Sequence, residues 1–279
     1  MKLLKAVPAG FEDSADEYDD FSAYSVVPSN SAGAGQNNFT AHDIEEESSL
    51  TKSDPITPPL PTAQAALLHS GPLPPSPLSS HTTYTDITVS QVSSPHQFSV
   101  QPLSSKHLYH SLSEQMNNHY TTSTPRTVPV ENLEPDCVVA VKYRGSWFRA
   151  EVTTFLRSHF LVCLRLVDTG KMIICTSRQD IQPLCSVFGE LPVQAVGARL
   201  DGVRPSSASS WWQVETDWFR ETVMGRDWVG VINNVEMEQQ DQTVLVMKLF
   251  DTSSDEDFDV SEAMKSLGLA TSNTELDTI

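Results

Sequence analysis

The sequence predicts a mainly β fold with helices, in which further strands and helices flank a small β-barrel and a disordered region precedes the whole. Residues 1–84 lack apolar periodicity and are rich in Pro, Ser, Thr and Gly, so burial cannot offset their ordering entropy. Short alternating strands crowd into about 50 residues after Asp136, which is typical of a small barrel. Strands and amphipathic helices flank these residues on both sides.

Charge is unevenly distributed along the chain, whose formal net charge is -18. Residues 1–84 carry 11 acids and 3 bases, residues 137–185 carry 3 acids and 7 bases, and residues 186–279 carry 17 acids and 6 bases. This excludes phosphate-backbone binding by the chain as a whole, which needs clustered Lys and Arg. We expect the acidic surface to favour cationic partners, of which Arg-rich peptides are the common intracellular example.

The folded part is predicted to begin near Thr85 with a hairpin and a helix. Residues 86–89 and 98–100 alternate apolar with polar side chains on either side of Ser-Ser-Pro, which predicts two antiparallel strands. Ser104 or Ser105 can cap a following helix that fades at residues 117–118. Its apolar side chains recur every fourth residue, at Leu108, Leu112 and Met116.

Short strands follow a polar linker over residues 121–129 and make up the predicted barrel. Turns are expected at residues 144–146 and 168–171, because Gly supplies positive φ there and Asp can bond its own backbone. The expected strands are residues 139–143, 147–153, 160–167, 172–176 and 181–184.

The remaining elements are a strand, a helix, a hairpin and a last short helix. A buried strand is expected over residues 194–203, and a hairpin over residues 229–235 and 244–250. Between them, Ser209 or Ser210 is expected to cap a helix whose apolar stripe is Trp211, Val214, Trp218 and Thr222. The last helix covers about residues 260–267, with a capping box of Asp259 and Glu262 and a stop at Gly268.

The chain shows no sequence pattern for a metal site, a disulfide framework or a membrane segment. The spacings of its four cysteines fit neither a CxxC pair nor a small disulfide set, so we expect reduced, buried thiols at Cys137, Cys163, Cys175 and Cys185. The basic start, residues 1–8, is followed by no apolar run, and no segment is long and apolar enough to cross a bilayer. We therefore expect a soluble intracellular protein.

Six segments, in order, resemble the extended Tudor domains of germline Tudor-domain proteins and of the Tudor nuclease-like coactivator. The first resembles the opening "SPxxFxVQ" hairpin, the next two look like "CxAxF…DGxWYRAxV", and the others are similar to "xDYGN", to "LPxQA" and to the closing helix. These segments are residues 92–101, 137–143, 145–152, 167–171, 191–195 and 267–270.

The resemblance implies a domain organisation for the whole chain. Residues 1–84 are a disordered acidic region, residues 85–271 are one extended Tudor domain, and residues 272–279 are a disordered tail. Within the domain, a Tudor barrel at about 133–185 separates two halves of an OB-like domain related to staphylococcal nuclease, residues 85–120 and 190–271.

The family's binding site is an aromatic cage for symmetrically dimethylated arginine, usually four aromatic residues and an Asn. The cation–π attraction of aromatic faces suits a methylated, weakly hydrated guanidinium. Here Tyr143 and Phe148 match the first two aromatic positions, whereas Leu166 and Thr169 stand at the third and fourth and Lys171 stands at the Asn position. Leu and Thr offer no π face, and Lys adds a repelling charge, so we predict weak or absent methylarginine binding.

Other interpretations of the same residues stay open. Tyr143 and Phe148 could be plain core residues, Trp147 favours packing over ligand contact, and Asp168 favours turn stabilisation over catalysis. His107 and His110 favour a solvated helix face over a metal site. Four crowded tryptophans favour core packing over a nucleic-acid stacking platform. An acidic run favours a solvated loop over a calcium loop. The tryptophans are Trp211, Trp212, Trp218 and Trp228, and the run is Asp251, Asp255, Glu256, Asp257 and Asp259.

The predicted function is a non-enzymatic adaptor without cofactor, metal or catalytic residues. The resemblance implies a protein partner, such as an Arg-rich or methylarginine-containing PIWI-type peptide, in cytoplasmic germ granules (nuage) of the piRNA pathway that silence transposons. Nuclease activity is not expected, because no compact Asp/Glu/Arg site is found in the second half. The alternative is RNA binding by the basic barrel, in which four cations would track phosphates. These cations are Arg144, Arg149, Arg165 and Lys171.

Overall fold

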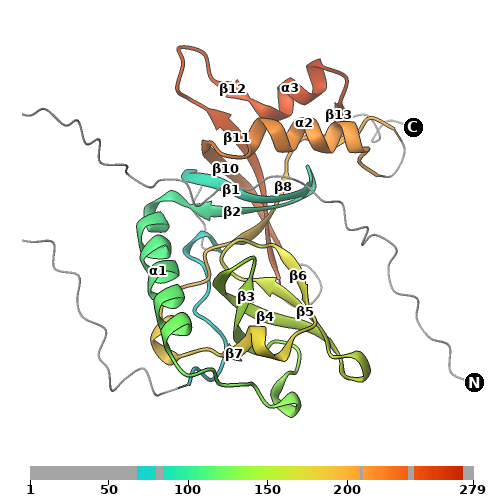
Figure 1. The fold of residues 1–279 in the computed structure, drawn as a ribbon. Coiled ribbons are helices and arrows are strands. Elements are labelled where there is room, and N and C mark those ends of the chain that lie inside the picture. Colours follow the sequence, from blue (N-terminus) through green and yellow to red (C-terminus); the bar gives the residue numbers. More distant parts are fainter. Residues whose placement is uncertain (1–67, 80–83, 208–209, 238–241, 273–279) are drawn as a thin grey trace, which may run out of the picture. The chain divides into compact units, whose positions relative to one another are not determined.

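The fold was analysed in a computed structural model of the chain, which describes residues 68–79, 84–207, 210–237 and 242–272. The described residues contain two β-sheets, a small two-stranded pairing and three α-helices (Figure 1). The prediction of a mainly β fold with helices is confirmed. The disorder predicted for residues 1–67 and for the tail from residue 273 lies outside the described residues.

The larger sheet closes on itself. Its strand order is β10-β1-β2-β8-β11-β12, and β10 also pairs with β11, so five strands form a ring from which β12 extends. All its pairings are antiparallel except that of β8 with β11. A closed five-stranded ring is the architecture of an OB-like barrel. Its strands are β1 (Tyr84–Ser94), β2 (Gln97–Pro102), β8 (Val196–Leu200), β10 (Asp227–Met237), β11 (Thr243–Asp251) and β12 (Phe258–Asp259).

The second sheet is the predicted small barrel, inserted between β2 and β8. Its order is β6-β5-β4-β3-β7 and every pairing is antiparallel. Arg144 and Gly145, with φ of 48° and 89°, make the tight turn between its first two strands. The strands coincide with those expected from alternation: β3 (Val138–Tyr143), β4 (Ser146–Leu156), β5 (Leu161–Leu166), β6 (Met172–Cys175) and β7 (Ile181–Pro183).

Helix α1 (Lys106–Thr122) packs along β4 of the small barrel (Figure 1). The prediction that it ends at residues 117–118 is wrong, because Tyr120 is buried and gives the last turn a packing surface. The predicted stripe also begins one turn too early, since Leu108 is 47% exposed whereas Leu112 and Met116 are buried. Ser105 lies at the N-cap position but makes no side-chain cap bond.

Helix α2 (Gln213–Val223) differs from its prediction in start and in face. The helix begins after Trp212, whose backbone N–H donates to the Glu215 carboxylate, and not after Ser210; Ser209 lies outside the described residues. Its buried face includes Phe219 and Val223. The predicted stripe is confirmed only in part: Trp211 and Trp218 pack against the core of the OB-like ring, whereas Val214 is 60% exposed. Helical spacing alone does not define which face the sheet will bury.

The last elements are α3 (Val260–Ser266) and the pairing of β9 (Val203–Pro205) with β13 (Ala270–Ser272). The Asp259 carboxylate accepts from the backbone N–H groups of Ser261 and Glu262, and Gly268 has a φ of 71°, so the predicted cap and stop of α3 are confirmed. The Glu262 side chain, the second member of the predicted capping box, pairs with Lys265. Short 3-10 helices cover Pro77–Ser79, Leu103–Ser105, Val130–Asn132, Arg157–His159, Arg178–Asp180 and Ser186–Gly189.

Three apolar clusters hold these elements together: one inside the OB-like ring, one inside the small barrel, and one between α1, the barrel and the segment that follows it. The third contains Tyr120, Trp147 and Phe188. All four cysteines are free; Cys175 and Cys185 are buried as predicted, whereas Cys137 and Cys163 are only half-buried.

Residues 68–79 pack on the domain, although the sequence placed them in a disordered region. Leu78 is 4% exposed and belongs to the core of the OB-like ring, and Leu73 packs against the third cluster. The His69 N–H donates to the Leu184 carbonyl at 2.7 Å, and the Pro74 carbonyl accepts from the Val193 N–H at 2.9 Å. The predicted boundary between disordered region and domain, at residue 84, is thus too late for this segment. Single leucines that follow no periodic pattern can still pack into the surface of a folded domain.

Candidate peptide-binding site on the small barrel

Two aromatic side chains meet at the end of the β3–β4 hairpin. The rings of Tyr143 and Phe148 lie 6.5 Å apart between centroids at 64°, and both are half-buried at the rim of the barrel core. Tyr143 stands on the core-facing side of β3 with Val139 and Val141, because side chains alternate along a strand. As the last residue of β3, it leaves part of its ring accessible to a ligand.

Two cationic side chains of the same chain lie against the Tyr143 ring. The Lys171 ammonium lies 5.3 Å from the ring centroid, and the Arg144 guanidinium lies 5.6 Å from the same centroid. Lys171 comes from the β5–β6 turn, where Gly170 has a φ of 77° and the Thr169 hydroxyl accepts from the Lys171 N–H at 3.4 Å. Both contacts are within the range of cation–π attraction.

The third and fourth cage-equivalent positions do not form walls beside this pair. Leu166 is 2% exposed and fills the barrel core. Thr169 is half-buried, and its carbonyl accepts a hydrogen bond from the Ser90 hydroxyl at 3.0 Å. The structure therefore brings together Tyr143, Phe148 and Lys171, whereas Leu166 is buried in the barrel core.

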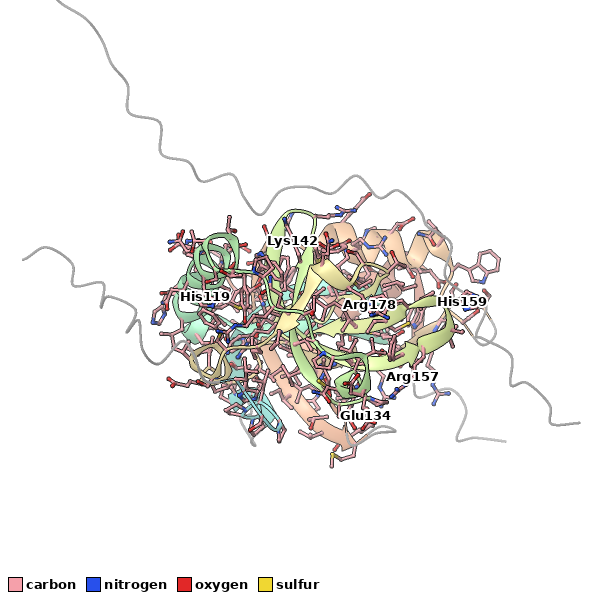
Figure 2. All side chains as sticks on the ribbon, turned by 60° about the horizontal axis from the view of Figure 1, so that its bottom comes forward. His119, Glu134, Lys142, Arg157, His159 and Arg178 are labelled. Atoms are coloured by element: carbon pink, nitrogen blue, oxygen red, sulfur yellow. The ribbon has the colours of Figure 1, made fainter. Side chains whose placement is uncertain are left out.

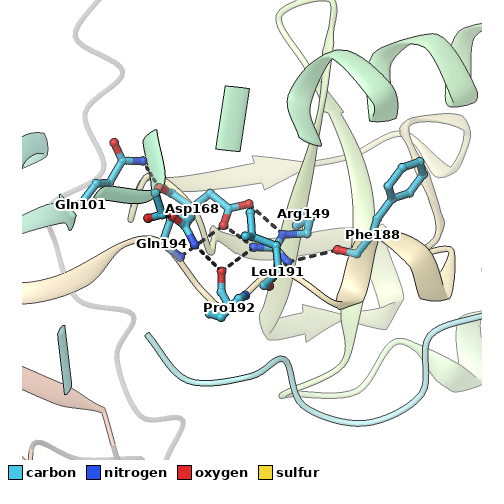
Figure 3. Close-up of polar contacts among 8 residues, drawn as sticks. Gln101, Arg149, Asp168, Phe188, Leu191, Pro192 and Gln194 are labelled. Carbon is cyan, nitrogen blue, oxygen red and sulfur yellow. Dashed lines mark hydrogen bonds and ion pairs between the residues drawn. The ribbon is translucent and has the colours of Figure 1, made fainter. Parts of the chain in front are cut away.

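Asp168 forms a buried ion pair with Arg149 that ties the small barrel to the segment leading into β8 (Figure 3). Nε and Nη2 of Arg149 donate to Oδ2 and Oδ1 of Asp168 at 2.9 and 2.5 Å. The same guanidinium donates to three backbone carbonyls, and Asp168 Oδ1 also accepts from the Gln194 N–H at 3.3 Å. The three carbonyls are those of Phe188, Leu191 and Pro192. Asp168 is thus a junction residue and not only a turn residue.

The sequence analysis missed the structural role of Arg149 and of two residues near Asp168, which are Gln101 and Tyr109. Gln101 on β2 donates its side-chain N–H to the Asp168 carbonyl, so both sheets contribute to the junction (Figure 3). Burial raises the pKa of the Tyr109 phenol above its usual range, the charge of Asp168 adds to the rise, and Arg149 opposes it. The one signal in the sequence was the apolar setting of Arg149, which stands between Phe148 and Ala150 within a predicted strand.

Trp147 packs away from the candidate site. It is 4% exposed and lies 4.9 Å from the Tyr120 ring between centroids, in the cluster beneath α1. Its backbone N–H donates to the Asn117 side chain at 2.8 Å. This position fits the packing role favoured for Trp147 over ligand contact.

The four cations of the RNA alternative do not form a continuous track. The Arg149 side chain is fully buried, and Arg165 is paired with Glu151. Other barrel cations, Lys142, Arg157 and Arg178, are exposed and spread over the surface in Figure 2. A phosphate backbone would therefore find two of the four expected contacts already engaged.

The other candidate features also have structural roles. His110 pairs with Glu114 on the exposed face of α1, and no cluster of potential metal ligands occurs within the described part of the chain. Trp228 is 2% exposed in the OB-like core, and Trp211 packs against His96, whereas Trp212 is 60% exposed. No helix among residues 68–79, 84–207, 210–237 and 242–272 is long and apolar enough to cross a membrane.

The small barrel and its flanks are similar to known Tudor-domain proteins. The family model for the Tudor domain matches residues 80–202. Tudor domain-containing protein 7 from Rattus norvegicus is 33% identical over 181 residues, and the Homo sapiens protein is 32% identical over the same length. Each alignment covers 64% of this chain and 16% of the relative, so the chain matches a small part of these longer proteins.

Solved structures show the same fold. The extended Tudor domain TD3 of mouse TDRD1, in complex with a MILI peptide containing dimethylarginine, has a TM-score of 0.60 at 20% identity, and the match covers 68% of this chain and 93% of that chain. The extended Tudor domain of Drosophila melanogaster Papi, in complex with a Piwi N-terminal peptide, has a TM-score of 0.60 at 21% identity, with 68% and 100% covered.

Proposed function

We propose that this chain, whose fold matches that of solved extended Tudor domains, is a non-enzymatic adaptor that holds a protein partner through the Tyr143–Phe148 face of the small barrel. The sequence resemblance supports a cytoplasmic setting in germline ribonucleoprotein assemblies of the piRNA pathway, such as germ granules that silence transposons. The peptides bound by the mouse and fly domains support a peptide from a protein partner as the ligand class.

The observation that carries the proposal is the convergence of Tyr143 and Phe148 at a partly accessible barrel rim, with Lys171 on the same ring. Partly accessible aromatic rings on a rigid strand pair supply contact area at low entropy cost, which is typical of peptide-binding surfaces. The face is a degenerate methylarginine cage, since two aromatic walls are absent and Lys171 is cationic. Methylarginine binding is therefore weak or lost, while a protein-binding surface remains.

A pull-down from germline tissue tests this function with the full chain. The wild type is compared with the Tyr143→Ala, Phe148→Ala double variant, and Trp212→Ala serves as a control for an exposed aromatic residue outside the barrel, on the OB-like half. Partners that use the rim are lost by the double variant and retained by the control, at equal thermal stability of all three proteins. Recovery of every partner with the double variant would show that the rim is not the binding surface.

A further inference from the structure

Lys171 occupies the position that a ligand cation would need. Its ammonium lies 5.3 Å from the Tyr143 centroid, and it belongs to none of the ion pairs formed among the described residues. A cationic ligand side chain approaching this ring must displace Lys171 or lie beside a like charge, which weakens binding. The ammonium has three N–H donors, and the ring can engage only one side of it.

The acids of the barrel do little to neutralise this charge. Residues 137–185 carry seven bases and three acids, a surplus of four positive charges. Glu151 is paired with Arg165, and Asp168 is paired with Arg149 inside the protein, which leaves Asp180 as the third acid. The barrel residues therefore carry a net positive charge, although the chain as a whole is acidic.

We propose that Lys171 is the specificity-determining residue of this rim and inverts its ligand charge, so that the rim binds an acidic peptide segment instead of a methylated arginine. A Glu or Asp carboxylate of the partner accepts hydrogen bonds from the Lys171 ammonium, and its methylene groups lie against the Tyr143 ring. This inference rests on the proposed function and names the partner chemistry of the same site.

Fluorescence anisotropy with the full chain tests the inversion. The probes are a labelled oligoglutamate peptide, a peptide with one symmetrically dimethylated arginine, and a single-stranded RNA of similar length. The variants are Lys171→Glu, Lys171→Asn and the matched charge reversal Lys142→Glu. Lys142 is an exposed lysine one residue before Tyr143 and on the opposite face of β3, so it changes net charge equally without touching the ring.

The expected result is that oligoglutamate binds the wild type, binds Lys171→Glu about tenfold more weakly, and binds Lys142→Glu within about twofold of the wild type. The methylarginine peptide gains about fivefold in affinity with Lys171→Asn, because the competing charge is gone. Equal weakening by Lys171→Glu and Lys142→Glu, or no oligoglutamate binding by the wild type, overturns the inference. Tighter binding of RNA than of oligoglutamate, with the same dependence on Lys171, overturns it in favour of a nucleic-acid ligand.

The inference and the proposed function fail in distinguishable ways. If oligoglutamate does not bind but the pull-down still loses partners with the Tyr143→Ala, Phe148→Ala variant, the rim is an adaptor surface of another chemistry. If the pull-down is unchanged and oligoglutamate does not bind, both are wrong.

Discussion

Arg149 on β4 and Asp168 in the β5–β6 turn form a two-bond ion pair with no exposed guanidinium surface. The same two residues bond to the segment leading into β8 and to β2, and so connect the small barrel to the OB-like ring. The pair is satisfied on both sides, because Arg149 also donates to three carbonyls and Asp168 also accepts from Gln194. A buried pair of this kind specifies geometry more than it adds net stability, but losing one partner leaves an unpaired buried charge. The position of Lys171, three residues after Asp168, depends on this junction.

Removing either partner of the junction is expected to destabilise the domain strongly. Asp168→Asn and Arg149→Met should each lower the free energy of unfolding by about 3–5 kcal/mol, and the double variant should lose less than the sum. Urea denaturation followed by tryptophan fluorescence measures this. Lys265→Met, which breaks the exposed pair with Glu262, is the control and should change the free energy by less than about 1 kcal/mol. Single variants that cost no more than this control would show that the junction is not required.

Gly170 is expected to be required by a close approach and not only by its backbone angle. An added Cβ would lie 2.1 Å from the Ser99 hydroxyl oxygen, whereas at Gly145, which also has positive φ, it would meet no atom within 4 Å. Gly170→Ala should therefore cost more than Gly145→Ala, about 3 against about 1 kcal/mol, measured by thermal unfolding. Equal costs would show that β2 and the β5–β6 turn can separate without loss.

The segment of residues 68–79 is expected to contribute to stability. Leu78→Ala should lower the free energy of unfolding by about 2–4 kcal/mol, because Leu78 is 4% exposed in the core of the OB-like ring. Chemical denaturation compares it with Leu108→Ala, where the side chain is 47% exposed and the loss should be below about 1 kcal/mol. Similar small losses in both variants would contradict the packing of this segment.

Stability should fall on mild acidification through His96. Burial lowers the pKa of His96 and the charges of Arg199 and Arg204 add to this, whereas the hydrogen bond to the Val203 carbonyl opposes it. The unfolded chain then binds the proton first, so the stability present above about pH 6.5 declines as the pH falls below that value and levels off below the folded pKa.

Urea titrations between about pH 7.5 and pH 5.5 measure this decline. His96→Gln keeps a donor for the Val203 carbonyl and should flatten the curve in part. The pKa of His119 is also lowered, by burial and then by Arg126, so His119→Gln should remove a further share. A wild type whose stability rises on acidification would contradict the sign.

The strands were predictable because alternation at period two marks a strand with one buried face, as in β5 with Val162 and Leu164. The helix faces were less predictable. Trp211 and Trp218 of the predicted stripe do pack against the OB-like core, but Val214 is exposed, and the fully buried side chains of α2 are Phe219 and Val223. The contribution of Leu78 has no periodic signal at all.

The candidate site was predictable only as positions along the chain. The resemblance placed Tyr143, Phe148 and Lys171 at equivalent positions, yet the Lys171–Tyr143 contact depends on the conformation of the β5–β6 turn. Arg149 appeared as one basic residue among seven in the barrel. Its pairing with Asp168 is a tertiary contact, which neither charge counts nor spacing reveal.

Isothermal titration of the full chain with a symmetrically dimethylated arginine peptide tests most directly the claim that this rim is a degenerate cage. The full chain is used because residues 68–79 pack on the domain. Each missing aromatic wall removes about 0.5–2 kcal/mol of cation–π attraction, and the Lys171 charge opposes the ligand. We expect binding weaker than a dissociation constant of about 10 μM, or none. A dissociation constant below about 10 μM would contradict the account.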